Sequence, residues 1–311
     1  MRIVYLSWPA REIAGGIKLA YRSVECLREN NIDAIVATPD GVGPQWFTAD
    51  TPTIRLNETR EHHDILVFPE NHTDFLRQFA NWRSPKVVFC QNQFMAFRGV
   101  AGDRCYGNFG VTHILAVGRH VAEFCARRFP KLRISSIPAF VDTETFRSAS
   151  KKQLAIVFAP RKRPQEAEFI RDLFCAENPQ WAHVPWVLLK GRNEQGVAKV
   201  LAESTNYLSL CRFEAYPLSI LEAMASGCIV AGFTGFGARN YTTSANGFWA
   251  EEDDCLDCVA QLAKAVQLVG KTEAYGEMVS QAIAVAQRHR KSAFTEKLIR
   301  FWSGFLESSN K

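Results

Sequence analysis

The sequence predicts an α/β protein made of two Rossmann-like, doubly wound domains in tandem that face a cleft. Short apolar runs rich in Val and Ile alternate with segments of helical period, and this alternation restarts after residue 150. Near-continuous apolar runs are typical of parallel strands that helices cover on both faces. A length of 311 residues and a hydrophobic content of 47% are enough for two such cores.

In the first half, six apolar runs are expected strands. Between the first two, Ile17, Tyr21 and Val24 follow the three-to-four spacing of an amphipathic helix, which we expect over residues 16–31. The order strand, helix, strand predicts a parallel sheet with right-handed crossovers. The expected strands are residues 2–7, 33–38, 64–69, 86–91, 113–118 and 134–139.

The same order returns in the second half, with a helix expected over residues 218–226. The polar residues 148–153 have no period, so we place the domain boundary there and expect one domain over residues 1–149 and another over 150–290. Residues 291–311 carry aromatic side chains at helical spacing and predict a packed C-terminal helix. The expected strands are residues 154–160, 186–191, 207–211 and 228–233.

Charge, cysteine content and hydropathy exclude several classes of protein. The net charge of +5 is mildly basic, and the basic clusters are separated and lack interleaved aromatic residues, so no nucleic-acid partner is predicted. Nine scattered cysteines indicate reduced thiols in a cytoplasmic protein, and Cys255–Cys258 has no second ligand pair for zinc. No run approaches the roughly 18 apolar residues of a membrane span. The N-terminal run, broken by Pro9, indicates a strand and not a signal peptide.

Ligands of open α/β sheets bind beyond the carboxyl ends of the strands, so the loops there are the candidate site. Gly15 and Gly16 follow the first strand and open the first helix, where backbone N–H groups can approach an anion. A glycine pair is also common in plain turns, which stays the alternative. The full G-x-G-x-x-G pattern of nicotinamide-binding proteins is absent.

The segment "PRKRP", residues 160–164, follows the first strand of the second half. Arg161 can form bidentate hydrogen bonds to phosphate and Lys162 supplies a point charge, so the loop suits a diphosphate. The alternative is a solvated basic loop, which its place at the cleft disfavours.

The segment "RFEAYPLSILEAMASGCIVAG" places Glu214 in a loop after a buried strand and Glu222 little more than one turn into the next helix. Pro217 suits the start of that helix, whose unpaired N–H groups point toward the same loop. Two isolated glutamates would more often be a capping acid and a solvent-facing helix residue. The combination of strand, acid, Tyr-Pro, helix, second acid and second strand favours a site.

Two polar segments follow strands of the first domain. His72 lies in "FPENHTDF" and Asn92 in "CQNQF", and each is a candidate binding residue. An ordinary loop role is an equally good reading of either residue.

The segment from Phe213 to Gly232 resembles the E-x(7)-E motif of glycosyltransferases with the GT-B fold, in particular the retaining, family 4-like group that uses nucleotide-sugar donors. The likeness extends along most of the chain in the family's order, through "AGGIKLAYRSVECLRENNIDAIV", "IPAFVDTETF" and "GFGARNYTTSANGFWAEEDD". It implies a GT-B enzyme with an acceptor-side first domain and a nucleotide-sugar-binding second domain. In that reading His72 and Asn92 are acceptor-side candidates, and the helix of residues 291–311 packs back toward the first domain.

The resemblance also implies roles for individual residues. Glu222 would bind the ribose hydroxyls, and Glu214 would lie near the donor sugar as the catalytic residue. Arg161 and Lys162 would neutralise the diphosphate, which Gly16 would approach from the first domain. The residues implied to supply backbone contacts to diphosphate and sugar are Tyr216, Pro217 and Leu218.

The expected reaction is transfer of a sugar to an acceptor hydroxyl on a glycan, lipid or small molecule, with retention of configuration. No D-x-D motif is present, so we expect no metal and no cofactor besides the nucleotide-sugar substrate. A lipid acceptor would bring the protein to the inner membrane face as a peripheral protein. Glu166 stands where the family commonly has a second phosphate-binding Lys, with Arg163 or Lys190 as substitutes. The alternatives are an inactive nucleotide-sugar or glycan-binding protein and a sugar-nucleotide epimerase.

Overall fold

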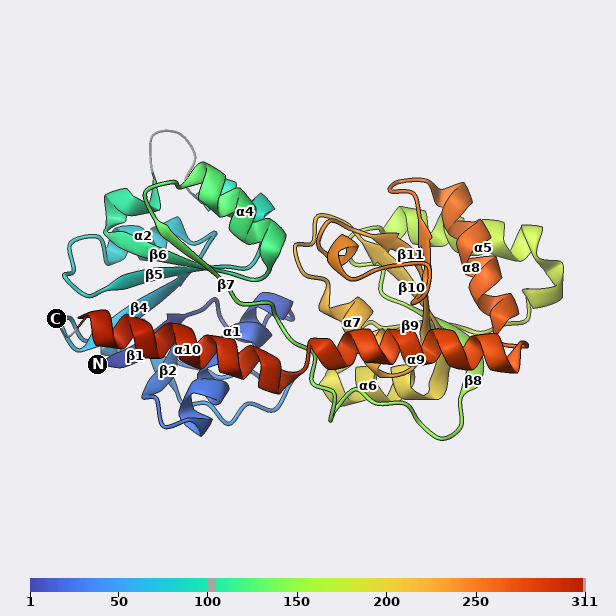
Figure 1. The fold of residues 1–311 in the computed structure, drawn as a ribbon, viewed down its shortest axis with the longest axis horizontal. Helices are drawn as coiled ribbons and strands as arrows, with labels where there is room; N and C mark the ends of the chain where they lie inside the picture. Colours follow the sequence, from blue (N-terminus) through green and yellow to red (C-terminus); the bar gives the residue numbers. More distant parts are fainter. Residues whose placement is uncertain (100–104, 310–311) are drawn as a thin grey trace. The chain divides into compact units, whose positions relative to one another are not determined.

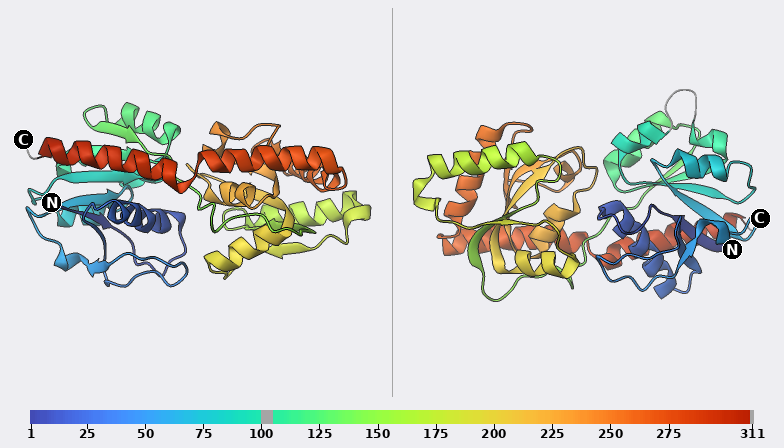
Figure 2. Two further views of the ribbon diagram at one scale, coloured as in Figure 1. Left: turned by 60° about the horizontal axis from the view of Figure 1, so that its bottom comes forward. Right: turned by 180° about the vertical axis from the view of Figure 1, so that it is seen from behind.

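The computed structural model describes residues 1–99 and 105–309, which form two compact units, Met1–Ala139 with Ser292–Lys311 and Phe140–Lys291. Each unit contains one parallel β-sheet with helices on both faces (Figures 1 and 2). The fold class predicted from the alternation of apolar runs and helical segments is therefore confirmed. No described helix has the length and the apolar character that crossing a membrane requires.

The first unit contains a seven-stranded sheet in the order β3-β2-β1-β4-β5-β6-β7. All six strands expected from the apolar runs form, and β3 is an addition of three residues that are only partly buried. The strands are β1 (Arg2–Leu6), β2 (Ala34–Thr38), β3 (Thr53–Arg55), β4 (Asp64–Pro69), β5 (Lys86–Cys90), β6 (Val111–Ala116) and β7 (Arg133–Ser136). The helices are α1 (Gly15–Glu29), α2 (Thr73–Gln78), α3 (Gln93–Gly99), α4 (Arg119–Arg128) and α10 (Lys291–Ser309), with short 3-10 turns η1 (Leu56–Glu58) and η2 (Tyr106–Phe109).

The C-terminal helix α10 packs into the core of the first unit. Trp302 is completely buried, and its indole N–H donates to the hydroxyl of Tyr5 in β1 at 3.3 Å. The two rings also meet edge to face. Residues 292–309 therefore belong to the same compact unit as the N-terminal strand, although almost 300 positions separate Tyr5 and Trp302 along the chain.

The second unit contains a five-stranded sheet in the order β12-β11-β10-β8-β9. Its strands are β8 (Gln153–Phe158), β9 (Trp186–Leu188), β10 (Ser204–Cys211), β11 (Ile229–Thr234) and β12 (Phe248–Ala250). Its helices are α5 (Pro164–Glu177), α6 (Glu194–Glu203), α7 (Leu218–Ala225), α8 (Cys255–Leu268) and α9 (Thr272–Arg288), with 3-10 turns η3 (Pro179–Trp181) and η4 (Gly237–Asn240).

Strand β10 shows how this sheet builds two hydrophobic cores. Tyr207 and Cys211 pack on one face with residues of α6, α7 and α9, whereas Leu208 and Leu210 pack on the other face with residues of α5 and α8. Successive side chains of a strand point to opposite faces, so a strand buried on both faces has a continuous apolar sequence. This burial explains why β10 could be recognised from the sequence.

Candidate active site

The strand order of the second unit creates a switch point between β8 and β10, which are neighbours in the sheet although β9 lies between them along the chain. The sheet has the flavodoxin-like order 2-1-3-4-5, in which the chain leaves these two strands toward opposite faces. The loops after β8 and β10 therefore diverge at the carboxyl edge and leave room for a ligand. The segment "PRKRP" follows β8 and "RFEAYP" follows β10.

The structure brings the expected acid and the expected cations together at this edge. The Lys162 ammonium lies 3.0 Å from Oε1 of Glu214, and the Arg161 guanidinium lies 3.7 Å from the same oxygen. The side chain of Arg161 is 62% exposed, whereas those of Lys162 and Glu214 are mostly buried. A carboxylate and two cations in a half-buried loop pair form a site that can hold a ligand carrying both hydroxyls and negative charge.

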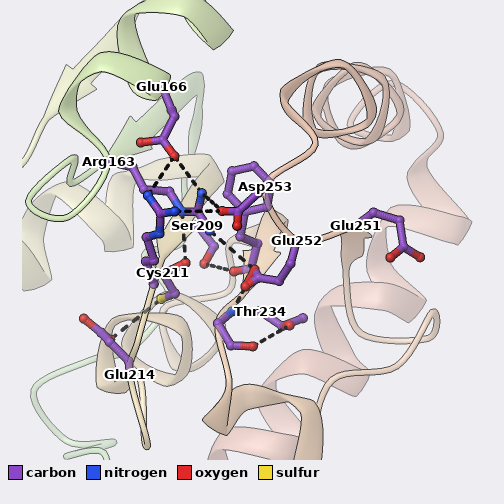
Figure 3. Close-up of polar contacts among 12 residues, drawn as sticks. Arg163, Glu166, Ser209, Cys211, Glu214, Thr234, Glu251, Glu252 and Asp253 are labelled. Atoms are coloured by element: carbon purple, nitrogen blue, oxygen red, sulfur yellow. Dashed lines mark hydrogen bonds and ion pairs between the residues drawn. The ribbon is translucent and has the colours of Figure 1, made fainter. Parts of the chain in front are cut away.

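Packing beneath the loop places Glu214. Its carbonyl oxygen accepts a hydrogen bond of 2.9 Å from the backbone N–H of Gly237 in η4. A Cβ at Gly237 would lie 1.8 Å from the carbonyl oxygen of Ala215, so only glycine allows this approach. The Cys211 thiol lies 3.8 Å from Oε2 of Glu214, and Figure 3 shows the two side chains together. The residue before the acid, Phe213, has a φ of 50°, a left-handed backbone that a bulky residue rarely adopts.

Helix α7 begins directly after this loop. Pro217 is its N-cap residue, one position before the helix and not within the first turn, and no side chain caps this end. The N–H groups at the start of a helix carry partial positive charge and can receive an anion. Glu222 lies one turn further along α7 and is partly exposed. Leu218 is half-buried, whereas Ile220, Leu221 and Met224 are buried in the core.

The side chain of Tyr216 lies away from the acid–cation group. Its hydroxyl is hydrogen-bonded to Nδ1 of His289, which follows helix α9. Burial raises the pKa of the Tyr216 phenol well above its ordinary value. The next ring, Tyr241, donates its hydroxyl to the carbonyl oxygen of Pro217 at 3.2 Å. These contacts anchor the loop. Because Pro217 has no N–H and its carbonyl oxygen already accepts from Tyr241, backbone hydrogen bonds from this segment to a ligand would come from Tyr216 or Leu218.

Arg163 is the one expected phosphate-binding substitute that the structure contradicts. Its side chain has no exposed area, lies 2.6 Å from Asp253 and 2.8 Å from Glu166, and covers the Phe233 ring at 4.1 Å. Figure 3 shows the guanidinium directed into this acidic cluster, with Glu214 beyond Cys211. Glu166 therefore balances Arg163, which explains why an acid stands at the position expected for a Lys. Lys190 lies beyond the end of β9 and is exposed.

The first unit has its own switch point between β1 and β4, the strands at which its order reverses. Gly15 and Gly16 begin α1, and the preceding Ala14 provides no side-chain cap. The Gln91 amide donates a hydrogen bond of 3.0 Å to the carbonyl oxygen of Gly16. A Cβ at Gly16 would lie 3.2 Å from that amide's oxygen, so the glycine allows the side chain of Gln91 to lie close.

His72 follows β4 and is held in one tautomer. Trp8 stacks on its ring with centroids 3.8 Å apart, and Nδ1 accepts a hydrogen bond of 3.4 Å from the backbone N–H of Phe75. Burial lowers the pKa of His72 to about 4, so the ring is neutral near pH 7. With Nδ1 as acceptor, the neutral ring carries its proton on Nε2 and can donate a hydrogen bond from there.

Asn92 caps helix α3, because its Oδ1 accepts a hydrogen bond of 3.0 Å from the backbone N–H of Phe94. Trp8, Glu70 and Gln91 lie just after β1, β4 and β5 and were not predicted as site residues. A polar or aromatic residue directly after an expected strand was the available signal. Among the described residues no group of three or more His, Cys, Asp or Glu side chains is arranged to hold a metal ion.

No protein-family model matches the chain. It is 26% identical over 253 residues to an alpha-1,6-glucosyltransferase of Actinobacillus pleuropneumoniae serotype 7. The aligned residues cover 75% of this chain and 73% of the relative. Its fold is similar to that of sucrose-phosphate synthase from Thermosynechococcus elongatus, with a TM-score of 0.71 and 11% identity over 99% of this chain and 100% of that chain.

Two further solved structures share the fold and were determined with nucleotides. Anabaena HepE in complex with UDP-glucose has a TM-score of 0.68 and 13% identity, covering 98% of this chain and 100% of that chain. The pneumococcal O-GlcNAc transferase GtfA in complex with UDP and GlcNAc has a TM-score of 0.70 and 10% identity, covering 99% of each chain. The chain thus has the fold of the GT-B glycosyltransferases, and it is similar in sequence to one glucosyltransferase.

Proposed function

We propose that the protein is a glycosyltransferase that moves a hexosyl residue from a UDP-sugar to an acceptor hydroxyl, with UDP-glucose as the first donor to test. The observation that carries this proposal is the convergence of Glu214, Lys162 and Arg161 beside the start of α7. The glucosyltransferase relative and the UDP-glucose complex of HepE support the choice of donor.

The cations and the helix start would bind the leaving group. As the glycosidic bond breaks, negative charge develops on the β-phosphate, and charges already in place stabilise it without reorganisation. Lys162 and Arg161 would supply full positive charges, and the N–H groups of the first turn of α7 would supply partial ones. The backbone of Tyr216, Pro217 and Leu218 would line the same space. These groups would do the work of a metal ion, so the proposed reaction needs none.

The two glutamates would bind the rest of the donor. Glu222, one turn into α7, would accept hydrogen bonds from the ribose hydroxyls. Glu214 would hold the hydroxyls of the sugar and stabilise the positive charge that develops on its ring. Glu214 pairs with Lys162 at 3.0 Å, so the acid and the cation orient each other before the donor arrives. We propose retention of the anomeric configuration, as in the family that the E-x(7)-E segment resembles.

The acceptor would bind at the first unit's switch point, as a glycan, a lipid or a small molecule. The Nε2–H of neutral His72 would donate to a sugar hydroxyl, and Asn92 would line the same edge. Gly15 and Gly16 would let an anion approach the N–H groups at the start of α1. A lipid acceptor would also require contact with a membrane surface.

Nucleotide release on incubation with donor tests the proposal. Purified protein is incubated with UDP-, GDP-, ADP- and dTDP-glucose, and released nucleotide and protein melting temperature are measured. We expect release and stabilisation with the UDP-sugar, since a ligand at about 100 times its Kd adds roughly 2.7 kcal/mol to the free energy of unfolding. Stabilisation without release would indicate a binding protein, and the absence of both with all four donors would refute the proposal.

A further inference from the structure

Arg163 is a buried arginine to which the proposed reaction assigns no role. It directly follows Lys162, it is the N-cap residue of α5, and its side chain has no exposed area. A buried charge loses its hydration, so a buried ion pair is weak evidence for a contribution to stability. The question is therefore which parts of the protein the guanidinium holds in place.

The guanidinium contacts residues that lie at or beyond the ends of two other strands. Its Nε donates a hydrogen bond of 3.2 Å to the carbonyl oxygen of Cys211, the last residue of β10. Its Nη1 donates to Oδ1 of Asp253 at 2.6 Å, and its Nη2 lies 3.7 Å from Oε1 of Glu252. Both acids follow β12, and Figure 3 shows them around the guanidinium. One side chain of the loop after β8 thus joins the loops after β10 and β12.

Strand β11 is tied to the same group. Oε1 of Glu252 accepts a hydrogen bond of 3.3 Å from the backbone N–H of Gly235, which follows β11. The ring of Phe233, in β11, lies against the guanidinium with 4.1 Å between its centroid and the guanidinium carbon. Because a guanidinium is planar and presents its N–H donors in fixed directions, it fixes the relative positions of its partners more closely than an ammonium group does.

Two residues of the proposed donor site lie next to these anchor points. Lys162 directly precedes Arg163, and Glu214 lies three positions after Cys211. The Cys211 thiol also lies 3.8 Å from Oε2 of Glu214. The buried hydrogen bond from Arg163 to Cys211 therefore joins the same two loops as the ion pair of 3.0 Å between Lys162 and Glu214.

We propose that Arg163 is a positioning residue of the donor site, which holds the loops after β8 and β10 at the spacing at which Lys162 meets Glu214. Arg163 touches no substrate and acts through the backbone of its own loop and of Cys211. The inference rests on the proposed function for the ligand, whereas the spacing of the loops is a property of the ligand-free protein. All of the groups involved lie in the second unit.

Calorimetric titration of UDP into two variants tests the inference. Arg163→Lys keeps the charge, but an ammonium group cannot replace the contacts to Cys211 and Asp253 together, so the Kd for UDP should rise about tenfold. Asp253→Asn weakens the same anchor from the solvent side and should raise the Kd about threefold, although the Asp253 side chain is 60% exposed. The double variant should bind UDP as weakly as Arg163→Lys, since both changes break one chain of contacts.

The choice of asparagine preserves the backbone at this position. Asp253 has a φ of 65°, a left-handed conformation that Asn and Asp adopt more readily than most residues. A change in affinity in Asp253→Asn therefore reports the loss of the carboxylate charge and not a change of the turn.

Asp172→Asn is the matched control. Asp172 is another exposed acid of the second unit that pairs with an arginine, Arg171, at 3.0 Å. Its replacement should leave the Kd for UDP unchanged. A rise in the control as large as in Asp253→Asn, or an unchanged Kd in Arg163→Lys, would overturn the inference.

Hydrogen exchange of the ligand-free protein distinguishes a displaced loop from general destabilisation. The amide of Gly237 donates to the carbonyl oxygen of Glu214 at 2.9 Å and reports on the loop after β10. The amide of Cys228, which donates to the carbonyl oxygen of Ala223 at 2.9 Å beyond the other end of α7, is the reference.

Exchange in Arg163→Lys and Asp253→Asn should be faster at Gly237 and unchanged at Cys228. Equal acceleration at both amides, or no acceleration at Gly237, would refute the inference and leave the proposed function intact in a protein that binds UDP. If the wild type binds no UDP, the proposed function is refuted, and exchange at Gly237 alone decides whether Arg163 holds the loop.

Discussion

At the scale of single residues, the site depends on charges whose partners are already in place. Lys162 and Arg161 lie near one oxygen of Glu214, which already restricts their side chains. They therefore lose less conformational entropy when a diphosphate binds. Arg163, the next residue, does not face this site, because it forms ion pairs with Glu166, Glu252 and Asp253. Adjacent cations of one loop thus divide into two that face the site and one that fixes the loop.

Replacing Glu214 by Gln tests the role of its charge. The amide keeps the shape and removes the negative charge that would oppose the positive charge on the sugar. We expect kcat for UDP-glucose to fall by about 100-fold or more, the loss found when one electrostatic group is removed from a preorganised site. Glu203→Gln, at the exposed end of α6, is the control and should behave as the wild type. A kcat for Glu214→Gln within about threefold of wild type would exclude a catalytic role.

The pKa of Glu70 predicts a pH dependence of stability. Its folded-state pKa of about 7 lies above the ordinary 4.5, so the native state binds more protons than the unfolded state between these values. The contribution of Glu70 to the free energy of unfolding should therefore decrease by about 3 kcal/mol as the pH rises through this window.

Urea unfolding of the wild type and Glu70→Gln from pH 5 to pH 8 measures this slope as a difference. The comparison with the variant is needed because the pKa of His72 is lowered to about 4. The contribution of His72 to the free energy of unfolding therefore decreases as the pH falls below the ordinary pKa of 6.5. That opposing slope is present in both proteins and cancels. A wild-type-minus-variant difference that is flat over this range would show that Glu70 does not titrate there.

At the scale of elements, turn η4 holds the loop that carries Glu214. Gly237→Ala should displace this loop, because the added Cβ would lie 1.8 Å from the carbonyl oxygen of Ala215. We expect a loss of about 1–3 kcal/mol in the free energy of unfolding together with a loss of turnover.

The control for this substitution is Gly276→Ala in helix α9 of the same unit. A Cβ at Gly276 meets no atom within 4 Å, so alanine should raise stability by up to about 1 kcal/mol through its helix propensity. Thermal unfolding and UDP release are measured for both variants to test whether η4 fixes the loop. Equal stability of the two variants would show that η4 accommodates the Cβ and does not fix the loop.

At the scale of the whole molecule, the sequence predicts the elements that are buried and long. Strand β10 is eight residues that are all buried, whereas β3 and β12 have three residues each, so their sequences are too short to give a strand signal. The convergence of Glu214 with Lys162 was predictable because both follow strands of one parallel sheet.

The burial of Arg163 could not be predicted, because its partner Asp253 lies 90 positions away along the chain. The burial of Glu70 could not be predicted for a related reason. Glutamate is rarely buried without a partner, so its sequence context indicated an exposed loop residue. Its burial results from loops that meet only after the sheet has formed.

Metal removal tests the chemistry of the site as a whole. We expect turnover of UDP-glucose to persist in excess chelator, because Lys162, Arg161 and the start of α7 provide the positive charge that the leaving diphosphate needs. The measurement is UDP release with and without EDTA, followed by addition of Mg²⁺ or Mn²⁺. Loss of activity in chelator and its recovery with a divalent cation would contradict this part of the account.

The central claim is that Lys162 and Arg161, which lie beside Glu214, bind the donor diphosphate. Calorimetric titration of UDP into the wild type, Lys162→Ala and Lys199→Ala tests it most directly, since Lys199 is an exposed lysine on α6 of the same unit. We expect Lys162→Ala to raise the Kd for UDP by about tenfold or more and Lys199→Ala to leave it unchanged. Equal affinity of all three proteins for UDP, or no binding by the wild type, would contradict the claim.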